Sequence, residues 1–308
     1  MPIWFVGCKQ TRLSSSNADR MLVAMALTAK IDLAYLQAAK HDGRKFSVLT
    51  CYDVATARLM EAAGVEVLLV GDTAGEVVLG LPATRDINPE FLIELTAAVR
   101  RGAPHAFLVA DLPHACRSED IATTISWCQR FSSETGCDAV KIEVAAEDVD
   151  LVRRVHEAGV PVVAHVGLLP QYVDAETGYR AQARDADGAA KLIAITRAME
   201  LAGASVLLLE AVASEVAHDI TLRAQVPVIG CVAGPHCDGT VVVLHDMIGL
   251  GGGHPPRAVK RYENLADIMT NAFRHYVADI HAGEFPVEKD AIHMKPGEHD
   301  KLKEHYPE

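Results

Sequence analysis

Eight short apolar runs recur along the chain, and segments of helix length separate them. Val, Leu and Ile fill these runs with little polar alternation, which is typical of parallel strands buried on both faces of a sheet. The runs are SVLTCYD (47–53), VEVLLVGD (65–72), AFLVAD (106–111), DAVKIE (138–143), PVVAHV (161–166), SVLLLE (205–210), VPVIGC (226–231) and VVVLHD (241–246). They predict the eight strands of a parallel sheet.

The segments between the runs have helical periodicity, which is clearest at 89–101 and 188–202. Gly102 and Gly203 follow these two segments, where helices commonly have a C-terminal cap. Eight strands alternating with helices predict an α/β fold of the (β/α)₈ barrel type, the TIM barrel. A doubly wound sheet remains the alternative, because the order of elements is compatible with both. A length of 308 residues suits a single barrel.

Two flanking segments complete the predicted organisation. Residues 1–28 are interpreted as an N-terminal extension that lies outside a catalytic barrel of residues 29–286. After the eighth strand, residues 257–282 have the pattern of one long C-terminal helix. Residues 287–308 are charged and are interpreted as a C-terminal tail.

The composition limits the partners that the chain can have. A formal net charge of −12 makes a nucleic-acid backbone or an anionic membrane an unfavourable partner. No uncharged stretch is long enough to span a bilayer, and we find no signal peptide, so we expect a cytoplasmic protein that acts on a small molecule. Seven cysteines, an odd number without a CxxC pair, indicate reduced thiols and no zinc site.

Many of the apolar runs end in a polar residue. Because the active site of a parallel barrel lies at the carboxyl ends of its strands, these residues should converge on one cavity. They are Asp72, Asp111, Glu143, His165 and Glu210. Four carboxylates would repel one another without a cation, and oxygen ligands suit Mg²⁺ better than zinc. At each single position an N-terminal helix cap or a structural histidine is the alternative.

Two further residues accompany this acidic group. Lys141 lies two residues before Glu143 and therefore points to the same side of its strand. It either binds a substrate carboxylate or forms a structural ion pair. Thr73 offers a hydroxyl and a backbone N–H to an anion, or is a plain turn residue. The glycine-rich segment 249–254 lacks the lysine of a phosphate-binding P-loop and carries little weight.

The sequence resembles the ketopantoate hydroxymethyltransferase family in many of these segments. The similarity covers roughly residues 29 to 286, and its segments follow one another in the same order as in the family. The matching segments are TCYDVATARLMEAAGVEVLLVGDTAG (50–75), AAVRRGAP (97–104), LVADLP (108–113), VKIE (140–143), HVGLLPQ (165–171), GYRAQAR (178–184), LLLE (207–210), PVIG (227–230), AG (233–234), LHDMIGLGGGHPP (244–256) and GEFP (283–286).

The resemblance implies a barrel related to the phosphoenolpyruvate mutase and isocitrate lyase group. Members usually depend on Mg²⁺ and often form decamers, so a homo-oligomer is implied as well. The metal is associated in the family with three acidic positions, which fall here on Asp72, Asp111 and Glu143. The resemblance therefore assigns to these three residues the role of metal ligands.

The resemblance also implies the reaction and its other residues. The metal, Thr73 and Lys141 would hold the 2-oxo acid, and Glu210 would accept the proton from its C3 atom. His165 would line the substrate pocket or orient Glu210. The resulting enolate would attack 5,10-methylenetetrahydrofolate, the one-carbon donor of the family. With 3-methyl-2-oxobutanoate the product would be 2-dehydropantoate, an intermediate of pantothenate biosynthesis.

Four loops depart from the family pattern. Leu81-Pro82 stands where a polar residue is usual, Val144-Ala145 replaces Gly-Gly, and Ala183 and Val232 each replace a glycine. Each change adds a side chain to bare backbone or removes a polar contact near the mouth. A paralogue with another 2-oxo acid or another one-carbon donor therefore stays open. So does a folate-independent C–C lyase or aldolase, whereas retention of the site residues argues against a non-catalytic binding protein.

Overall fold

The computed structural model describes residues 27–173, 178–251 and 259–306 of the chain. The described residues belong to two compact units, one that ends at Leu244 and one that begins at His245. The predicted N-terminal extension lies outside the described residues except at its last two positions. Most of the glycine-rich segment 249–254 and the start of the predicted C-terminal helix lie outside them as well.

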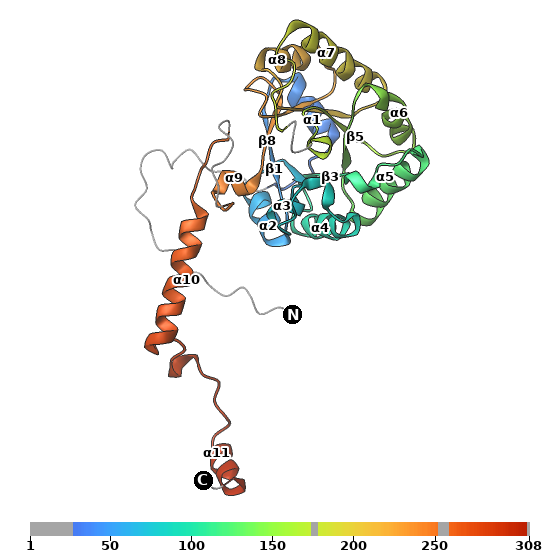
Figure 1. Cartoon of the computed structure of the whole chain (residues 1–308). Helices are drawn as coiled ribbons and strands as arrows, with labels where there is room; N and C mark the ends of the chain where they lie inside the picture. Colours follow the sequence, from blue (N-terminus) through green and yellow to red (C-terminus); the bar gives the residue numbers. More distant parts are fainter. Residues whose placement is uncertain (1–26, 174–177, 252–258, 307–308) are drawn as a thin grey trace. The chain divides into compact units, whose positions relative to one another are not determined.

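The first unit is a closed parallel barrel of eight strands (Figure 1). The strands are β1 (Phe46–Thr50), β2 (Val67–Val70), β3 (Phe107–Asp111), β4 (Ala139–Glu143), β5 (Val162–Gly167), β6 (Val206–Glu210), β7 (Val228–Cys231) and β8 (Gly239–Val242). Each strand pairs with the next, and Val48 of β1 lies between Val67 of β2 and Val241 of β8. The predicted TIM barrel is confirmed, and the pairing of β1 with β8 excludes the doubly wound alternative.

Helices surround the strands of this unit (Figure 1). They are α1 (Leu33–His41), α2 (Val54–Ala62), α3 (Ala74–Val77), α4 (Pro89–Gly102), α5 (Ile121–Thr135), α6 (Val149–Glu157), α7 (Ala186–Leu201) and α8 (Ser214–Arg223). Five of them begin at a residue whose side chain accepts a hydrogen bond from a backbone N–H of the first turn, which stabilises the helix start. These cap residues are Asp32, Asp53, Asn88, Asp120 and Asp185.

The two glycines predicted as helix caps have different roles. Gly203 follows α7 with φ +101°, and a Cβ atom there would lie 2.5 Å from the His156 ring. Gly102 is instead the last residue of α4, whose C-terminal cap is Ala103. A Cβ atom on Gly102 would lie 2.5 Å from the Val54 carbonyl oxygen, so glycine allows α4 to pack closely on α2.

The inward-facing positions of the strands form two layers. Because strand side chains alternate with a period of two, residues 107, 109 and 111 of β3 all face the interior. The apolar layer contains Val48, Val67, Leu69, Phe107, Val109, Ala139, Val163, Val206, Leu208, Ile229 and Val241. The polar layer contains Asp111, Lys141, Glu143, His165 and Glu210. The inward-facing residues of each strand are therefore apolar in the barrel core and polar at the carboxyl end, where they line a cavity.

The eighth strand and the C-terminal helix differ from the prediction. The eighth strand was expected at 241–246, but β8 ends at Val242 and is followed by α9 (Leu244–Ile248). The Leu244 N–H donates to Thr50 Oγ1 at 2.8 Å instead of joining the ladder. The expected helix 257–282 is α10 (Leu265–Ala282), because Tyr262 N donates to Met247 O and so leaves the helical pattern.

The second unit contains α10 and two later elements. These are η6 (Glu288–Asp290) and α11 (Glu298–His305). Gly283 ends α10 with φ +68°, a left-handed conformation that favours glycine. In the parts of the chain that the structure describes, no helix is both long enough and apolar enough to cross a membrane.

Candidate active site

All seven predicted site residues line one pocket at the carboxyl ends of the strands. They are Asp72, Thr73, Asp111, Lys141, Glu143, His165 and Glu210. Asp111, Glu143 and Glu210 are the last residues of β3, β4 and β6, whereas Asp72 follows β2 in the turn that leads into α3. Neither Asp72 nor Asp111 is the N-terminal cap of the element that follows it, so the capping alternative does not apply to them.

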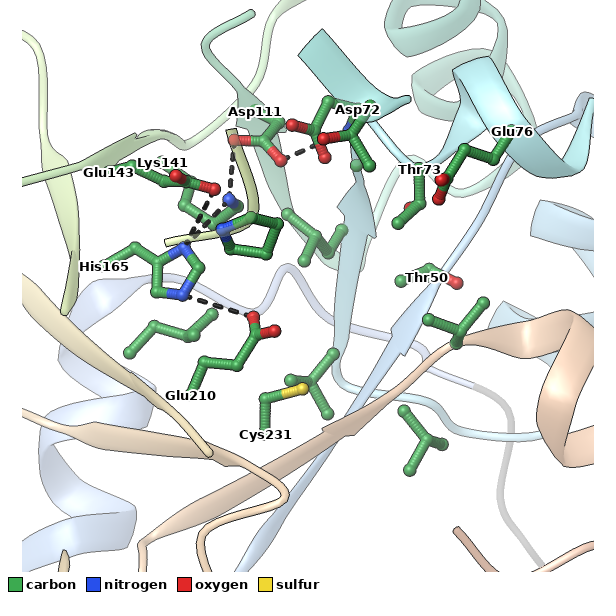
Figure 2. A pocket seen from close by; sticks show the side chains of 18 of the residues that line it. Thr50, Asp72, Thr73, Glu76, Asp111, Lys141, Glu143, His165, Glu210 and Cys231 are labelled. Atoms are coloured by element: carbon green, nitrogen blue, oxygen red, sulfur yellow. Dashed lines mark hydrogen bonds and ion pairs between the residues drawn. The ribbon is translucent and has the colours of Figure 1, made fainter. Parts of the chain in front are cut away.

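A line of polar contacts crosses the wall formed by β3 to β6 (Figure 2). Lys141 Nζ lies 2.7 Å from Asp111 Oδ1 and 3.2 Å from His165 Nδ1. On the other side of the imidazole, Nε2 lies 3.2 Å from Glu210 Oε2. These distances follow from the register, because Asp111 pairs with Lys141 and Glu143 pairs with His165 on adjacent strands.

The contact with Lys141 determines which nitrogen of His165 carries the ring proton. A lysine ammonium only donates hydrogen bonds, so His165 Nδ1 is the acceptor and the ring proton resides on Nε2. Burial, and then the positive charge of Lys141, lower the pKa of His165 and favour this neutral form. His165 can therefore direct one N–H toward the Glu210 carboxylate.

The site contains several buried carboxyl groups but only one buried ammonium, that of Lys141. Asp111 and Glu143 are 1% and 2% exposed. Burial raises the pKa of Asp111 to about 8 and that of Glu143 to about 9, although the charge of Lys141 opposes both shifts. Burial would lower the pKa of Lys141, but the nearby carboxylates of Asp111, Asp72 and Glu143 raise it. The cluster therefore favours any additional positive charge.

The donor chemistry of this cluster fits a hard divalent cation. When the carboxyl groups of Asp72, Asp111 and Glu143 are all ionised, the one ammonium of Lys141 leaves two negative charges, which a divalent cation would balance. Asp111 Oδ1 is buried, and the ammonium of Lys141 lies next to it at 2.7 Å. No three acidic, histidine or cysteine side chains in the described chain are placed to enclose a metal by themselves. Because Mg²⁺ commonly keeps several waters and uses one or two carboxylates, the three acids would hold such an ion partly through water.

Gln171 is a site residue that the sequence argument missed. Its side-chain Nε2 donates to Asp72 Oδ2 at 2.9 Å and to Leu112 O at 3.1 Å, and its backbone N–H donates to Glu143 Oε2 at 3.1 Å. Gln171 is 1% exposed and lies in η5 (Pro170–Tyr172), directly after β5. It therefore holds two of the candidate metal ligands in place from one side.

Tyr52 plays a comparable role for Thr73. The Tyr52 hydroxyl and Thr73 Oγ1 are 2.6 Å apart, and Tyr52 is 4% exposed. Burial raises the pKa of Tyr52, so the phenol keeps its proton and remains available as a hydrogen-bond donor. The sequence places Tyr52 next to the first predicted strand but gives no sign of this contact.

Three residues near the mouth have left-handed backbone conformations that normally require glycine. Ala183, Ala211 and Val232 have φ values of +55°, +51° and +52°. Hydrogen bonds join them, from Gln182 N to Ala211 O and from Ala211 N to Cys231 O. Ala183 and Val232 are positions where the resembled family has glycine, so strain was foreseeable there. Ala145, by contrast, has φ −117° and needs no glycine.

Comparison with known proteins adds independent information. The family model described as ketopantoate hydroxymethyltransferase matches residues 30–288. A 3-methyl-2-oxobutanoate hydroxymethyltransferase of Halalkalibacterium halodurans is 43% identical over 256 residues, which are 83% of this chain and 92% of that protein. A protein of the same name from a Geobacillus species is 42% identical, over 83% of this chain and 90% of that protein.

The solved structures are similar in fold. One is 2,3-dimethylmalate lyase, a member of the phosphoenolpyruvate mutase and isocitrate lyase superfamily, with a TM-score of 0.54. It is 15% identical to this chain, and the match covers 89% of this chain and 97% of the lyase. Phosphonopyruvate hydrolase in complex with oxalate and Mg²⁺ has a TM-score of 0.55 at 15% identity, over 89% of this chain and 98% of that chain.

Proposed function

Because the chain belongs to the ketopantoate hydroxymethyltransferase family, we propose that it transfers a hydroxymethyl group to 3-methyl-2-oxobutanoate. The observation that carries the proposal is the position of Glu210. Its carboxylate lies 3.2 Å from His165 Nε2 and lines the same pocket as Lys141 and the three buried acids. This arrangement supports a role for Glu210 as a proton acceptor beside a site for an anionic substrate.

The substrate side of the pocket is the side of Lys141 and Thr73. Lys141 is the one lysine or arginine among the described lining residues, so it attracts the substrate carboxylate. Thr73 presents a hydroxyl whose orientation is set by Tyr52. These two residues would hold the acid with its C3 atom directed toward Glu210.

Mg²⁺ belongs to the proposal as a cofactor held by Asp72, Asp111 and Glu143. When bound it would supply a positive charge that polarises the 2-oxo group and makes the C3 proton more acidic. Gln171 would keep the carboxylates of Asp72 and Glu143 oriented for this purpose.

Glu210 would remove the C3 proton as a general base. The N–H of His165 would hold the Glu210 carboxylate in position. The electron pair released from the C3–H bond would form a new C–C bond to the one-carbon unit of 5,10-methylenetetrahydrofolate. That carbon is bonded to two folate nitrogens, and both C–N bonds would break, so that the two nitrogens leave as the N–H groups of tetrahydrofolate. Water would provide the oxygen of the hydroxyl group of 2-dehydropantoate and the second of the two protons, the first being the C3 proton.

Carbon transfer from labelled folate tests this function against a folate-independent lyase. The protein is incubated with Mg²⁺, 3-methyl-2-oxobutanoate and 5,10-methylenetetrahydrofolate that carries ¹³C in its methylene group. We expect the label in the hydroxymethyl carbon of 2-dehydropantoate by NMR, and no product without the folate. Glu210→Gln should abolish transfer, whereas Glu157→Gln, an exposed change on α6, should not.

The opposite results identify the alternatives. Cleavage of 2-dehydropantoate or a related 2-oxo acid without folate, combined with no labelled product, would favour the lyase reading. Transfer of the label to a different 2-oxo acid would indicate a paralogue with another substrate.

A further inference from the structure

The pocket has a further acidic side chain, Glu76, which lies beside Thr73 (Figure 2). Glu76 lies in the first turn of α3 and lines the same pocket as Glu210. Figure 2 shows it across the pocket from His165 and Glu210. Within the described chain no residue donates a hydrogen bond to its carboxylate or forms an ion pair with it. Glu76 is therefore an acceptor without a donor.

Glu76 is exposed at the pocket mouth, where water can reach its carboxylate. Burial, and then the charge of Asp72, raise the pKa of Glu76. An anionic 2-oxo acid would be repelled by Glu76 and attracted by Lys141, so the two ends of the pocket suit different ligands. A ligand that donates N–H groups would pair with the Glu76 carboxylate, because hydrogen bonds to a carboxylate are stronger than those between neutral groups.

An aromatic side chain accompanies Glu76 at the mouth. Tyr179 lines the same pocket and is 66% exposed, which is high for a tyrosine in a folded unit. An exposed ring beside a pocket offers a flat surface on which a planar ligand can stack. Burial, and then the negative charges of Glu76 and Glu210, raise the pKa of Tyr179.

Exposed large apolar side chains are frequent on the segments that follow the strands of the barrel unit. Eight large apolar side chains are exposed between Leu27 and Leu244, and five of them lie in segments that follow a strand at its carboxyl end. These five are Val78, Leu79, Tyr172, Tyr179 and Val232. Of these five, Tyr179 lines the pocket, and an exposed aromatic ring there is typical of a ligand-binding site.

We propose that Glu76 and Tyr179 bind the nitrogen-containing heterocycle of the one-carbon donor. The Glu76 carboxylate accepts hydrogen bonds from its N–H groups, and the Tyr179 ring stacks on its plane. A reduced pterin has the required chemistry, because its aminopyrimidine edge carries adjacent N–H donors and its ring is flat. The inference rests on the proposed transfer function and assigns the donor to the end of the pocket remote from Lys141.

The two half-reactions separate donor binding from proton removal. Exchange of the C3 proton of 3-methyl-2-oxobutanoate in D₂O needs no folate, whereas transfer needs it. We expect Glu76→Gln and Tyr179→Ala each to raise the KM for 5,10-methylenetetrahydrofolate at least tenfold, while proton exchange changes less than twofold. Tyr179→Phe keeps the ring and should retain the parent KM. Glu157→Gln, an exposed acid outside the pocket, is the control for Glu76.

Unchanged KM values in both variants would overturn the inference, and so would an equal loss of proton exchange. A direct binding measurement keeps the test independent of the transfer function. Calorimetry with tetrahydrofolate alone should give at least tenfold weaker binding to Glu76→Gln than to the parent. If the parent exchanges no proton but binds tetrahydrofolate through Glu76, the transfer function fails and the donor site stands; if exchange occurs and tetrahydrofolate does not bind, the reverse holds.

Discussion

The apolar layer and the polar layer of the barrel interior are built from the same strands, yet their chemistry is opposite. On β3, Phe107 and Val109 lead into Asp111, and on β6, Val206 and Leu208 lead into Glu210. The apolar layer gains stability from burial. The polar layer buries charges that are only partly paired, which costs stability. Each strand therefore contributes to stability through its earlier residues and to the site through its last residue. Substitutions in the apolar layer should mainly lower stability, and substitutions in the polar layer should mainly lower activity.

Phe107→Ala in the apolar layer should have the largest effect on stability. Phe107 is 2% exposed, and its removal leaves a cavity that the closed barrel cannot readily fill. We expect a loss of about 3–5 kcal/mol in the free energy of unfolding. Chemical denaturation measures the loss, and the activity of the remaining folded protein should stay within a factor of about two of the parent's, since typical core effects act through folding. A loss of activity without a loss of stability would contradict the assignment of Phe107 to a layer that serves stability alone.

The polar layer should make the stability of the metal-free protein fall as the pH rises. Asp111 and Glu143 bind their protons more tightly in the folded chain than in the unfolded one, where carboxyl groups titrate near about 4. This stabilisation is complete below that pH and is lost as the pH rises toward about 8 for Asp111 and about 9 for Glu143. Each group contributes up to about 1.4 kcal/mol per pH unit.

Thermal unfolding in EDTA between pH 5 and 9, measured at each pH unit, tests this dependence. Asp111→Asn should remove one contribution and make the curve flatter, and Mg²⁺ should flatten the curve of the parent. A stability that is constant or rises over this range would mean that the polar layer does not carry unbalanced charge.

Gln171→Leu should lower both stability and Mg²⁺ affinity, because Gln171 bonds two of the candidate metal ligands. The change leaves Asp72 Oδ2 and a backbone carbonyl without their donor, which costs about 1–3 kcal/mol. We also expect about 10- to 100-fold weaker Mg²⁺ binding in calorimetry, since residues that orient metal ligands have effects of this size. Thr135→Val removes a buried hydroxyl on α5 that bonds Phe131 O, so it should lose stability and keep the Mg²⁺ affinity. Equal Mg²⁺ affinity in both variants would contradict the role of Gln171.

Val232→Gly should have the smallest effect, and it should be a gain. Val232 has φ +52°, where a branched side chain is strained by about 1–2 kcal/mol. Part of that gain is offset by the greater freedom of glycine in the unfolded chain, so we expect a net stabilisation of about 1 kcal/mol or less. Val78→Gly at φ −107° is the matched control and should destabilise. A destabilised Val232→Gly would show that the side chain at the rim contributes more contact energy than strain.

The sequence predicted the barrel because a parallel barrel is encoded locally. Each strand reads as a short apolar run, and helices such as 89–101 appear within one or two residues of their observed bounds. The errors lie where a distant contact decides. The last residues of the eighth run belong to α9, because the Leu244 N–H bonds Thr50. The helix α10 begins after its predicted start, because the Tyr262 N–H bonds Met247 O. Such contacts leave no periodic signal.

The polar layer was predictable because its residues end strands, whereas its supports were not. Gln171 is 28 residues from Glu143 and 99 residues from Asp72 in the chain, so only the closed barrel brings them together. Glu76 and Tyr179 resemble ordinary surface residues in the sequence, and only their place at the pocket mouth distinguishes them.

Proton exchange tests the central claim, which is that Glu210 removes the C3 proton from a 2-oxo acid held in the polar layer. The protein is incubated with Mg²⁺ and 3-methyl-2-oxobutanoate in D₂O, and NMR follows the loss of the C3 proton. We predict exchange that requires Mg²⁺ and that is at least about 100-fold slower in Glu210→Gln, in line with general-base catalysis. Exchange at the parent rate in Glu210→Gln, or no exchange with any 2-oxo acid, would contradict the account.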